Sequence, residues 1–141
     1  MNPTFKSLHQ AHAVALGAYE REELWPDGVR EALRALLDFL GSEPEQAHTY
    51  LVELRYSPGG YQHLVAAREA FTSFLTPGHD SSPNLPLLTA ELITGGVLHL
   101  MTRHALEGRV AELPSTLAEL TCLVLGPYLS AEEVGRAVQR C

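Results

Sequence analysis

Apolar side chains recur along most of this chain every three or four residues, the spacing of one face of an α-helix. A first helix is predicted from residue 5 to about residue 20. A second is predicted to begin at Pro26 and to carry an apolar face as far as Leu40, with Gly41 as its end. Proline at the first helical position and glycine just after the last are typical of helix ends. No segment alternates for long enough to predict a strand, so the chain is predicted to be all-helical.

The middle of the chain carries two further apolar stripes and one irregular stretch. Ser42 and Glu45 have the spacing of a capping box, which predicts the start of a third helix. The sequence SPGG at 57–60 predicts a turn, and a fourth helix follows with apolar positions from Leu64 to Leu75. Residues 76–86, TPGHDSSPNLP, contain three prolines and no periodicity, so they are predicted to form a loop.

The last third of the chain predicts two long helices and a short one. The first should run from about residue 87 to 107 and end at Gly108, and the second should begin at Pro114 and run to about residue 129. Ser130 and Glu133 form another capping-box pattern, which predicts a short terminal helix. The expected fold is therefore one domain over residues 1–141, an all-α bundle of six to seven helices.

Two adjacent glycines interrupt an otherwise strong helical segment, LITGGVLHLMTRHALEGR. Gly95 and Gly96 together should cost about 2 kcal/mol of helix stability relative to two alanines. Gly95, His99 and Arg103 are each four residues apart, so they share one helical face. Small residues allow two helices to approach closely, which predicts a contact between two copies of the chain. The alternatives are close packing within one chain or a local kink.

Composition and charge exclude several classes of protein. The chain is 45% hydrophobic and 19% charged, as expected for a globular domain. Its formal charge is -7 and Lys6 is its one lysine, so direct binding of nucleic acid is not expected. No apolar run reaches the ~18 residues of a membrane span, and the first residues do not resemble a signal peptide. The two cysteines are no disulfide framework, which favours a cytoplasmic setting, and Cys122 is expected to be buried and inert.

The sequence contains no recognisable set of catalytic or metal-binding residues. His99 and His104 are five residues apart and lie on different helical faces, and His9 and His12 lack a third ligand, so no metal site or other cofactor is expected. Neither a nucleophile elbow nor a phosphate-binding loop is present. An enzyme that used His99, Arg103 or Glu53 as acid–base groups would need a partner group that spacing does not place. The chain is therefore predicted not to be an enzyme.

Aromatic and polar residues on apolar helices suggest a small-molecule site instead. An apolar cavity with a few polar groups is the usual form of such sites. The alternative is that the aromatic residues only pack in the core and that Glu53 is solvated. The candidate ligand-binding residues are Tyr50, Glu53, Tyr56, Phe71, Phe74, His99 and Arg103.

The order of these segments resembles one family. A helix with WP and ALRALLDFL precedes SEPEQAHTYLVEL, a glycine-rich turn and a proline-rich stretch, and the chain closes with GG, EGR, ELPSTLAEL and LGPYLSAEE. This arrangement resembles the C-terminal domain of tetracycline-repressor-type (TetR) transcription regulators, over nearly the whole chain. The resemblance implies a helical domain that binds a small apolar or amphipathic effector and forms a homodimer, in which the last two long helices of each copy pack together as a four-helix bundle. It places Gly95, Gly96, Leu117, Leu120, Thr121, Val124 and Tyr128 at or near that dimer interface.

The chain departs from the family at its start, where a helix-turn-helix DNA-binding domain would be expected. No helical pair with a basic face precedes the first helix, so DNA contacts are expected only through a domain that this sequence lacks. Two functions then remain. One is an effector-binding and dimerisation domain; the other is a dimerisation module that binds no ligand and pairs with itself or with full-length relatives.

Overall fold

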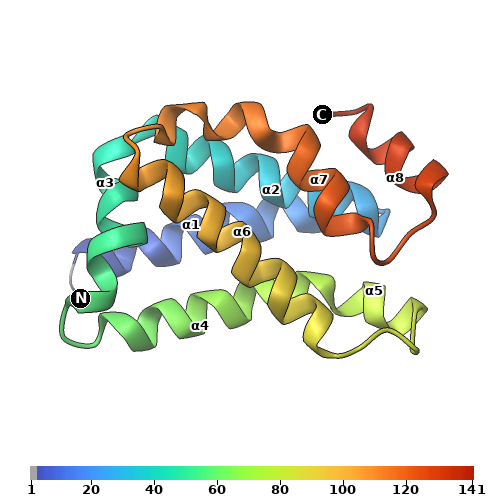
Figure 1. Ribbon diagram of the computed structural model, residues 1–141, viewed down its shortest axis with the longest axis horizontal. Helices are drawn as coiled ribbons and strands as arrows, with labels where there is room; N and C mark the ends of the chain where they lie inside the picture. Colours follow the sequence, from blue (N-terminus) through green and yellow to red (C-terminus); the bar gives the residue numbers. More distant parts are fainter. Residues whose placement is uncertain (1–2) are drawn as a thin grey trace.

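The computed structural model describes residues 3–141, with side chains from Lys6 onward. All regular structure in this part of the chain is helical, so the predicted fold class is confirmed. Six helices have eight or more residues: α1 (Pro3–Glu20), α2 (Trp25–Ser42), α4 (Gly60–Thr72), α6 (Leu88–Leu106), α7 (Leu117–Leu125) and α8 (Ala131–Val138). They form a bundle in which α6 crosses in front of α1 and α2, with α4 below it and α7 above it (Figure 1).

α1 and α2 form an antiparallel pair behind α6 (Figure 1). Alanines on the contacting faces, among them Ala15 and Ala32, are buried and allow the two backbones to approach. On its other side α2 presents Leu37 and Leu40 to the core shared with α6 and with the segment before α7. The predicted proline at the start of α2 is confirmed, and the helix continues one residue past Gly41.

The third helical segment changes its winding twice. α3 (Pro44–His48) passes into a π-helical turn, Thr49–Glu53, and then into a 3-10 turn, Leu54–Tyr56. The predicted capping box at its start is wrong: Ser42 is the last residue of α2, and its hydroxyl donates to the carbonyl of Phe39 at 2.9 Å. The predicted turn at 57–60 is confirmed, with Gly59 in the left-handed region at φ 75°.

The stretch predicted as one loop is partly helical. α4 continues through a 3-10 turn, Ser73–Leu75, into α5 (Thr76–Ser81), so only the residues after Ser81 are irregular. Pro77 occupies the first turn of α5, where its missing N–H is tolerated. Gly78 lets this short helix approach the aromatic rings of Trp25 and Tyr128, which a Cβ would meet at 2.5 and 2.6 Å. Tertiary packing, which the sequence pattern does not show, therefore organises this segment.

The second of the two long C-terminal helices is shorter than predicted. α6 ends as expected before Gly108, which takes φ 70° and donates its N–H to the carbonyl of Ala105. The next helix does not begin at Pro114. A 3-10 segment, Val110–Thr116, contains this proline, and α7 begins only at Leu117. None of the described helices is long and apolar enough to cross a membrane.

The end of the chain is attached to α2 through a buried ion pair between Asp27 and Arg30, both residues of α2. The Asp27 carboxylate accepts from Arg30 at 2.6 Å and from Arg140 at 3.0 Å, and the Arg30 guanidinium also donates to the carbonyl of Ala137 at 3.4 Å. The predicted capping box at the start of α8 is confirmed, since the Ser130 hydroxyl accepts from the backbone N–H of Glu133. These contacts fix the end of the chain on the bundle.

Candidate functional site

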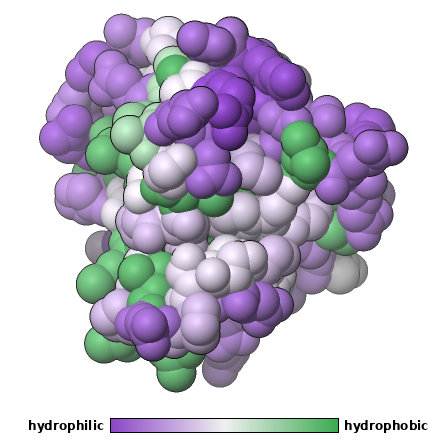
Figure 2. Space-filling view, turned by 90° about the vertical axis from the view of Figure 1, so that its right-hand side faces the viewer, coloured by the Kyte–Doolittle hydropathy of each residue, from purple (hydrophilic) through white to green (hydrophobic). Residues whose placement is uncertain are grey.

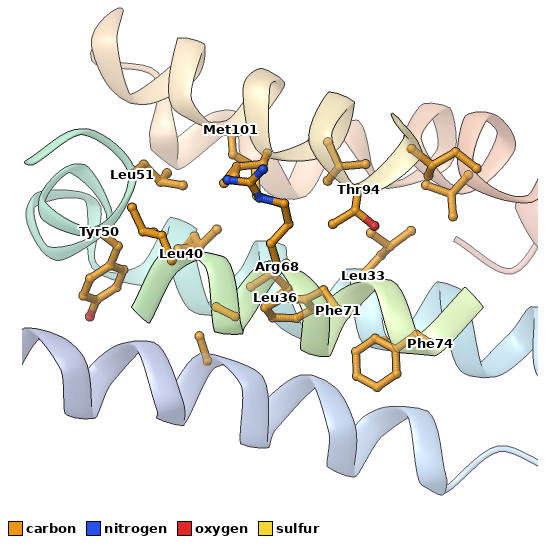
Figure 3. Close-up of a pocket in the computed structure, with 18 of the residues that line it drawn as sticks. Leu33, Leu36, Leu40, Tyr50, Leu51, Arg68, Phe71, Phe74, Thr94 and Met101 are labelled. Carbon is orange, nitrogen blue, oxygen red and sulfur yellow. The ribbon is translucent and has the colours of Figure 1, made fainter. Parts of the chain in front are cut away.

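A cavity of about 120 Å³ lies at the centre of the bundle, between α1, α2, α4 and α6. Figure 3 shows its walls, with α1 below, α6 above and the segment that carries Tyr50 and Leu51 at one end. Its lining is almost entirely apolar. The lining residues are Leu8, Ala11, Val29, Ala32, Leu33, Leu36, Leu40, Tyr50, Leu51, Leu64, Ala67, Arg68, Phe71, Phe74, Leu75, Ile93, Thr94, Val97, Leu98, Met101 and Val124.

Helical periodicity brings these side chains to one place. On α4, Leu64, Ala67, Arg68 and Phe71 are three or four residues apart and share the face that lines the cavity. At the end wall, the π-helical turn buries the neighbouring side chains of Tyr50 and Leu51 together. Turns of this kind are often found at functional sites.

An aromatic cluster supports the wall formed by Phe71 and Phe74. The ring of His12 stacks on Phe74 at 5.9 Å and meets Phe71 edge-on at 5.5 Å. Tyr19 stacks on Phe74 at 4.8 Å, and the indole N–H of Trp25 donates to the Phe74 carbonyl at 2.7 Å. The two phenylalanines therefore combine a packing role with a position on the cavity wall.

Arg68 is the one charged residue among the described lining residues. Its side chain extends from α4 across the cavity, and its guanidinium points towards α6 and Met101 (Figure 3). The Nε–H group is shielded from solvent and has no hydrogen-bond partner. An unpaired buried donor costs about 1–3 kcal/mol, and more when the group is charged. The cavity therefore contains a donor for which the described side chains provide no acceptor.

Polar groups elsewhere on the wall are already paired. The Tyr50 hydroxyl donates to the side-chain oxygen of Gln46 at 3.0 Å. The hydroxyls of Thr72 and Thr94 are 3.0 Å apart, and the Thr72 hydroxyl is also 2.8 Å from the carbonyl of Arg68. These groups can orient a ligand, but they already have hydrogen-bond partners, whereas the Nε–H of Arg68 has none.

The cavity volume limits the size of a ligand in this conformation. An engineered apolar cavity of about 150 Å³ stays dry and binds benzene, and typical sites for drug-sized ligands are about 300–1,000 Å³. At about 120 Å³ the present cavity suits a small ring or a short alkyl chain.

The structure brings three of the seven predicted ligand residues together on the cavity wall: Tyr50, Phe71 and Phe74. The other four lie elsewhere: Glu53, Tyr56, His99 and Arg103. Glu53 is in an open surface depression, 3.7 Å from His48, and Tyr56 is 82% exposed. The prediction assumed one regular helix through Tyr50, Glu53 and Tyr56, but the π and 3-10 turns place the last two on the surface.

His99 and Arg103 belong to the outer face of α6. The residues of this face are Leu88, Leu92, Gly95, Gly96, His99, Arg103 and Leu106. At 100° per residue around the helix axis, they span an arc of about 100°. These residues, together with Leu123 of α7, are called the α6–α7 outer face.

This outer face is open and rich in leucine. Leu88, Leu92 and Leu106 are 64%, 73% and 64% exposed, and Leu123 is 69% exposed. α6 and α7 both lie at the front of Figure 1, and hydrophobic residues gather along the left side of Figure 2, where that front falls. A Cβ built at Gly95 or Gly96 has no neighbouring heavy atom within 4 Å. Close packing within the chain therefore does not explain the two glycines.

Five of the predicted interface residues lie inside the protomer: Leu117, Leu120, Thr121, Val124 and Tyr128 are all buried in its own core. The prediction placed them at or near an interface with a second copy, whereas in the protomer their side chains pack into its own core. Because α7 is apolar around most of its circumference, periodicity does not show which face is buried. Cys122, predicted to be buried, is exposed beside Leu123.

Arg68 was not among the predicted site residues. Its place three to four residues from Leu64 and Phe71, on the apolar stripe of the fourth helix, is the signal that could have identified it. Among the described residues, no group of three or more His, Cys, Asp or Glu side chains is placed to hold a metal ion. No family model, curated protein or solved structure matches the chain.

Proposed function

We propose that this chain is a ligand-binding and dimerisation domain that senses a small apolar or amphipathic molecule, as the C-terminal domains of TetR-type regulators do. The observation that carries the proposal is the apolar cavity among α1, α2, α4 and α6. Protein interiors are close-packed, with few voids larger than a water molecule. A partly open apolar cavity of about 120 Å³ between four helices therefore favours a ligand site over a simple packing core.

The outer face supports pairing of two copies. Monomers rarely expose large contiguous apolar patches, and here exposed leucines lie on either side of two glycines on the same face. Two α6 helices that cross at Gly95 and Gly96 could approach closely, and the leucines would then be buried against the partner. This burial would offset the helix cost of the glycines.

One helix connects the two proposed activities. Ile93, Val97 and Met101 of α6 line the cavity, while Gly96 and His99 lie on the outer face. A ligand that shifts α6 would therefore change the relation between two subunits. Coupling of this kind is typically about 1–3 kcal/mol and acts equally in both directions.

Native mass spectrometry of the purified chain tests both parts of the proposal. The expected result is a dimer that carries one small additional mass per subunit, or that binds added 1-hexanol or hexanoate in a saturable way. A dimer that binds none of these would favour the alternative, a dimerisation module without a ligand. A monomer at micromolar concentration would contradict the proposed use of the outer face.

A matched pair of variants locates the ligand. Ala67 lines the cavity and Ala66, its neighbour on α4, is exposed and does not. Ala67→Leu should fill part of the cavity and weaken binding of 1-hexanol and hexanoate, whereas Ala66→Leu should leave binding unchanged. Circular dichroism on both variants confirms that α4 remains helical. Equal binding by both variants would place the ligand outside the cavity.

A further inference from the structure

We infer that the ligand of this cavity is an organic anion, with an apolar tail and a carboxylate that Arg68 binds. The inference rests on the proposed function, because it requires the cavity to be a ligand site. Its starting observation is that Arg68 is the one charged group on a described wall that is otherwise apolar.

Among the described residues, no acidic side chain pairs with Arg68. Most other arginines of this part of the chain do pair with carboxylates, as Arg30 does with Asp27. Its Nε–H is shielded from solvent and donates to nothing. A cation with a buried, unpaired donor on the wall of an apolar cavity is a site that an anion would complete.

The geometry of the guanidinium favours a carboxylate. Its N–H groups form a planar fork that matches the two oxygens of a carboxylate in a bidentate pair. In Figure 3 the guanidinium points from α4 towards α6 and Met101, while Phe71 and Leu33 are drawn further along the cavity. A carboxylate at Arg68 would therefore leave its alkyl or aryl tail against apolar walls.

The volume restricts the tail. A cavity of about 120 Å³ is close to the size that holds benzene, so a short-chain or monocyclic carboxylate fits this conformation. Phosphate and sulfate esters carry a larger, tetrahedral head group that matches the planar guanidinium and a cavity of this volume less well than a carboxylate does.

Arg68 has another possible role, in which its alkyl stem covers apolar surface while the remaining guanidinium N–H groups reach water. In that case an anion would gain nothing from the cavity. The two roles make opposite predictions for a carboxylate compared with a neutral molecule of the same length.

The experiment measures binding of sodium hexanoate and of 1-hexanol to the full chain at pH 7 by titration calorimetry or NMR. Hexanoate is ionised at this pH. Hydrogen bonds between a guanidinium and a carboxylate correspond to a factor of about ten or more in affinity. Hexanoate should therefore bind at least about tenfold more tightly than hexanol. Arg68→Met should remove this preference and leave hexanol binding intact.

Two further variants separate a local role of Arg68 from a change in net charge. Arg68→Lys retains the charge but loses the fork, so its preference for hexanoate should be intermediate. Arg136→Met removes a positive charge from an exposed pair on α8 and should leave the preference unchanged. Circular dichroism and denaturant unfolding show whether Arg68→Met folds; because it removes an unpaired buried donor, it should be at least as stable as the wild type.

The outcomes distinguish this inference from the function on which it rests. Hexanol that binds as well as hexanoate, in the wild type and in Arg68→Met, would overturn the anion assignment and leave the cavity as an apolar ligand site. Failure of both compounds to bind would overturn the ligand site itself. A preference for hexanoate that survives Arg68→Met would show that another group binds the carboxylate.

Discussion

Replacing the two central glycines of α6 with alanine, G95A/G96A, should stabilise the monomer and weaken the dimer. Both positions lie well inside a helix that runs from Leu88 to Leu106. A Cβ at either position would have no heavy atom within 4 Å, so the two added methyl groups would extend into open space in a single copy. The expected gain is the full difference in helix propensity, about 0.8–1.0 kcal/mol for each position and about 2 kcal/mol for both.

This gain is large enough to measure by thermal unfolding. The entropy of unfolding is about 2.1 cal/mol/K per residue, or roughly 0.3 kcal/mol/K for 141 residues. A gain of about 2 kcal/mol should therefore raise the Tm by about 7 °C. The Tm should be measured at a concentration where the wild type is monomeric, because dimerisation would also stabilise the folded state.

The same double variant should dimerise less well. In the proposed crossing, the methyl groups would lie between two α6 helices and hold them apart. Sedimentation velocity over a concentration series should show a larger dissociation constant. Gly135→Ala is the matched control: it lies inside α8, also has no atom within 4 Å of its Cβ, and is away from the outer face. It should increase stability by about 1 kcal/mol without changing dimerisation.

Two results would refute this reasoning. An unchanged dissociation constant would show that the glycines do not lie at a contact between copies. An unchanged or lower Tm of the monomer would show that the methyl groups meet an obstacle, or that α6 is not continuous at these positions.

Four other predictions concern the packing of the bundle and its surface. Asp27→Ala removes the buried partner of Arg30, which keeps its contacts with Glu31 and with the Ala137 carbonyl, so it should lower the free energy of unfolding in urea by about 1.5–3 kcal/mol. Ser130→Ala removes the cap of α8 and should cost about 1 kcal/mol. Hydrogen bonds from Ser130 lower the pKa of the Glu133 carboxyl group. The stabilisation that comes from the ionised Glu133 carboxylate is therefore present above the pKa of Glu133 in the unfolded chain, and it is lost as the pH falls through the pKa of Glu133 in the folded protein. Urea unfolding from pH 7 to pH 3 should show that loss in the wild type and less of it in Glu133→Gln. Leu123→Asp, at an exposed position, should abolish the dimer in sedimentation velocity while the monomer keeps its stability.

Local chemistry in the sequence predicts much of the helical framework. The capping box at Ser130 and the glycine that ends α6 act through backbone groups a few residues away, so their effects can be read from the sequence. The same kind of pattern at Ser42 was misleading, because α2 continues through that residue. The stretch from 76 to 86 was also misread, since α5 depends on contacts with Trp25 and Tyr128, which are distant in sequence.

Which face of an apolar helix is buried is decided by the tertiary structure. The sequence of α7 is apolar nearly all round, so the residues predicted to contact a second copy could not be distinguished from those in the protomer's own core. The cavity is likewise assembled from α1, α2, α4 and α6, and no local pattern encodes their spacing. The sequence by itself therefore determined that the chain is all-helical and where most of its helices end. It also showed a pair of glycines whose cost in helix stability required an explanation. Only the packing of the helices decided that Arg68 lies on the wall of an apolar cavity and that Gly95 and Gly96 lie on an open surface. Both positions depend on contacts between residues that are far apart in the chain.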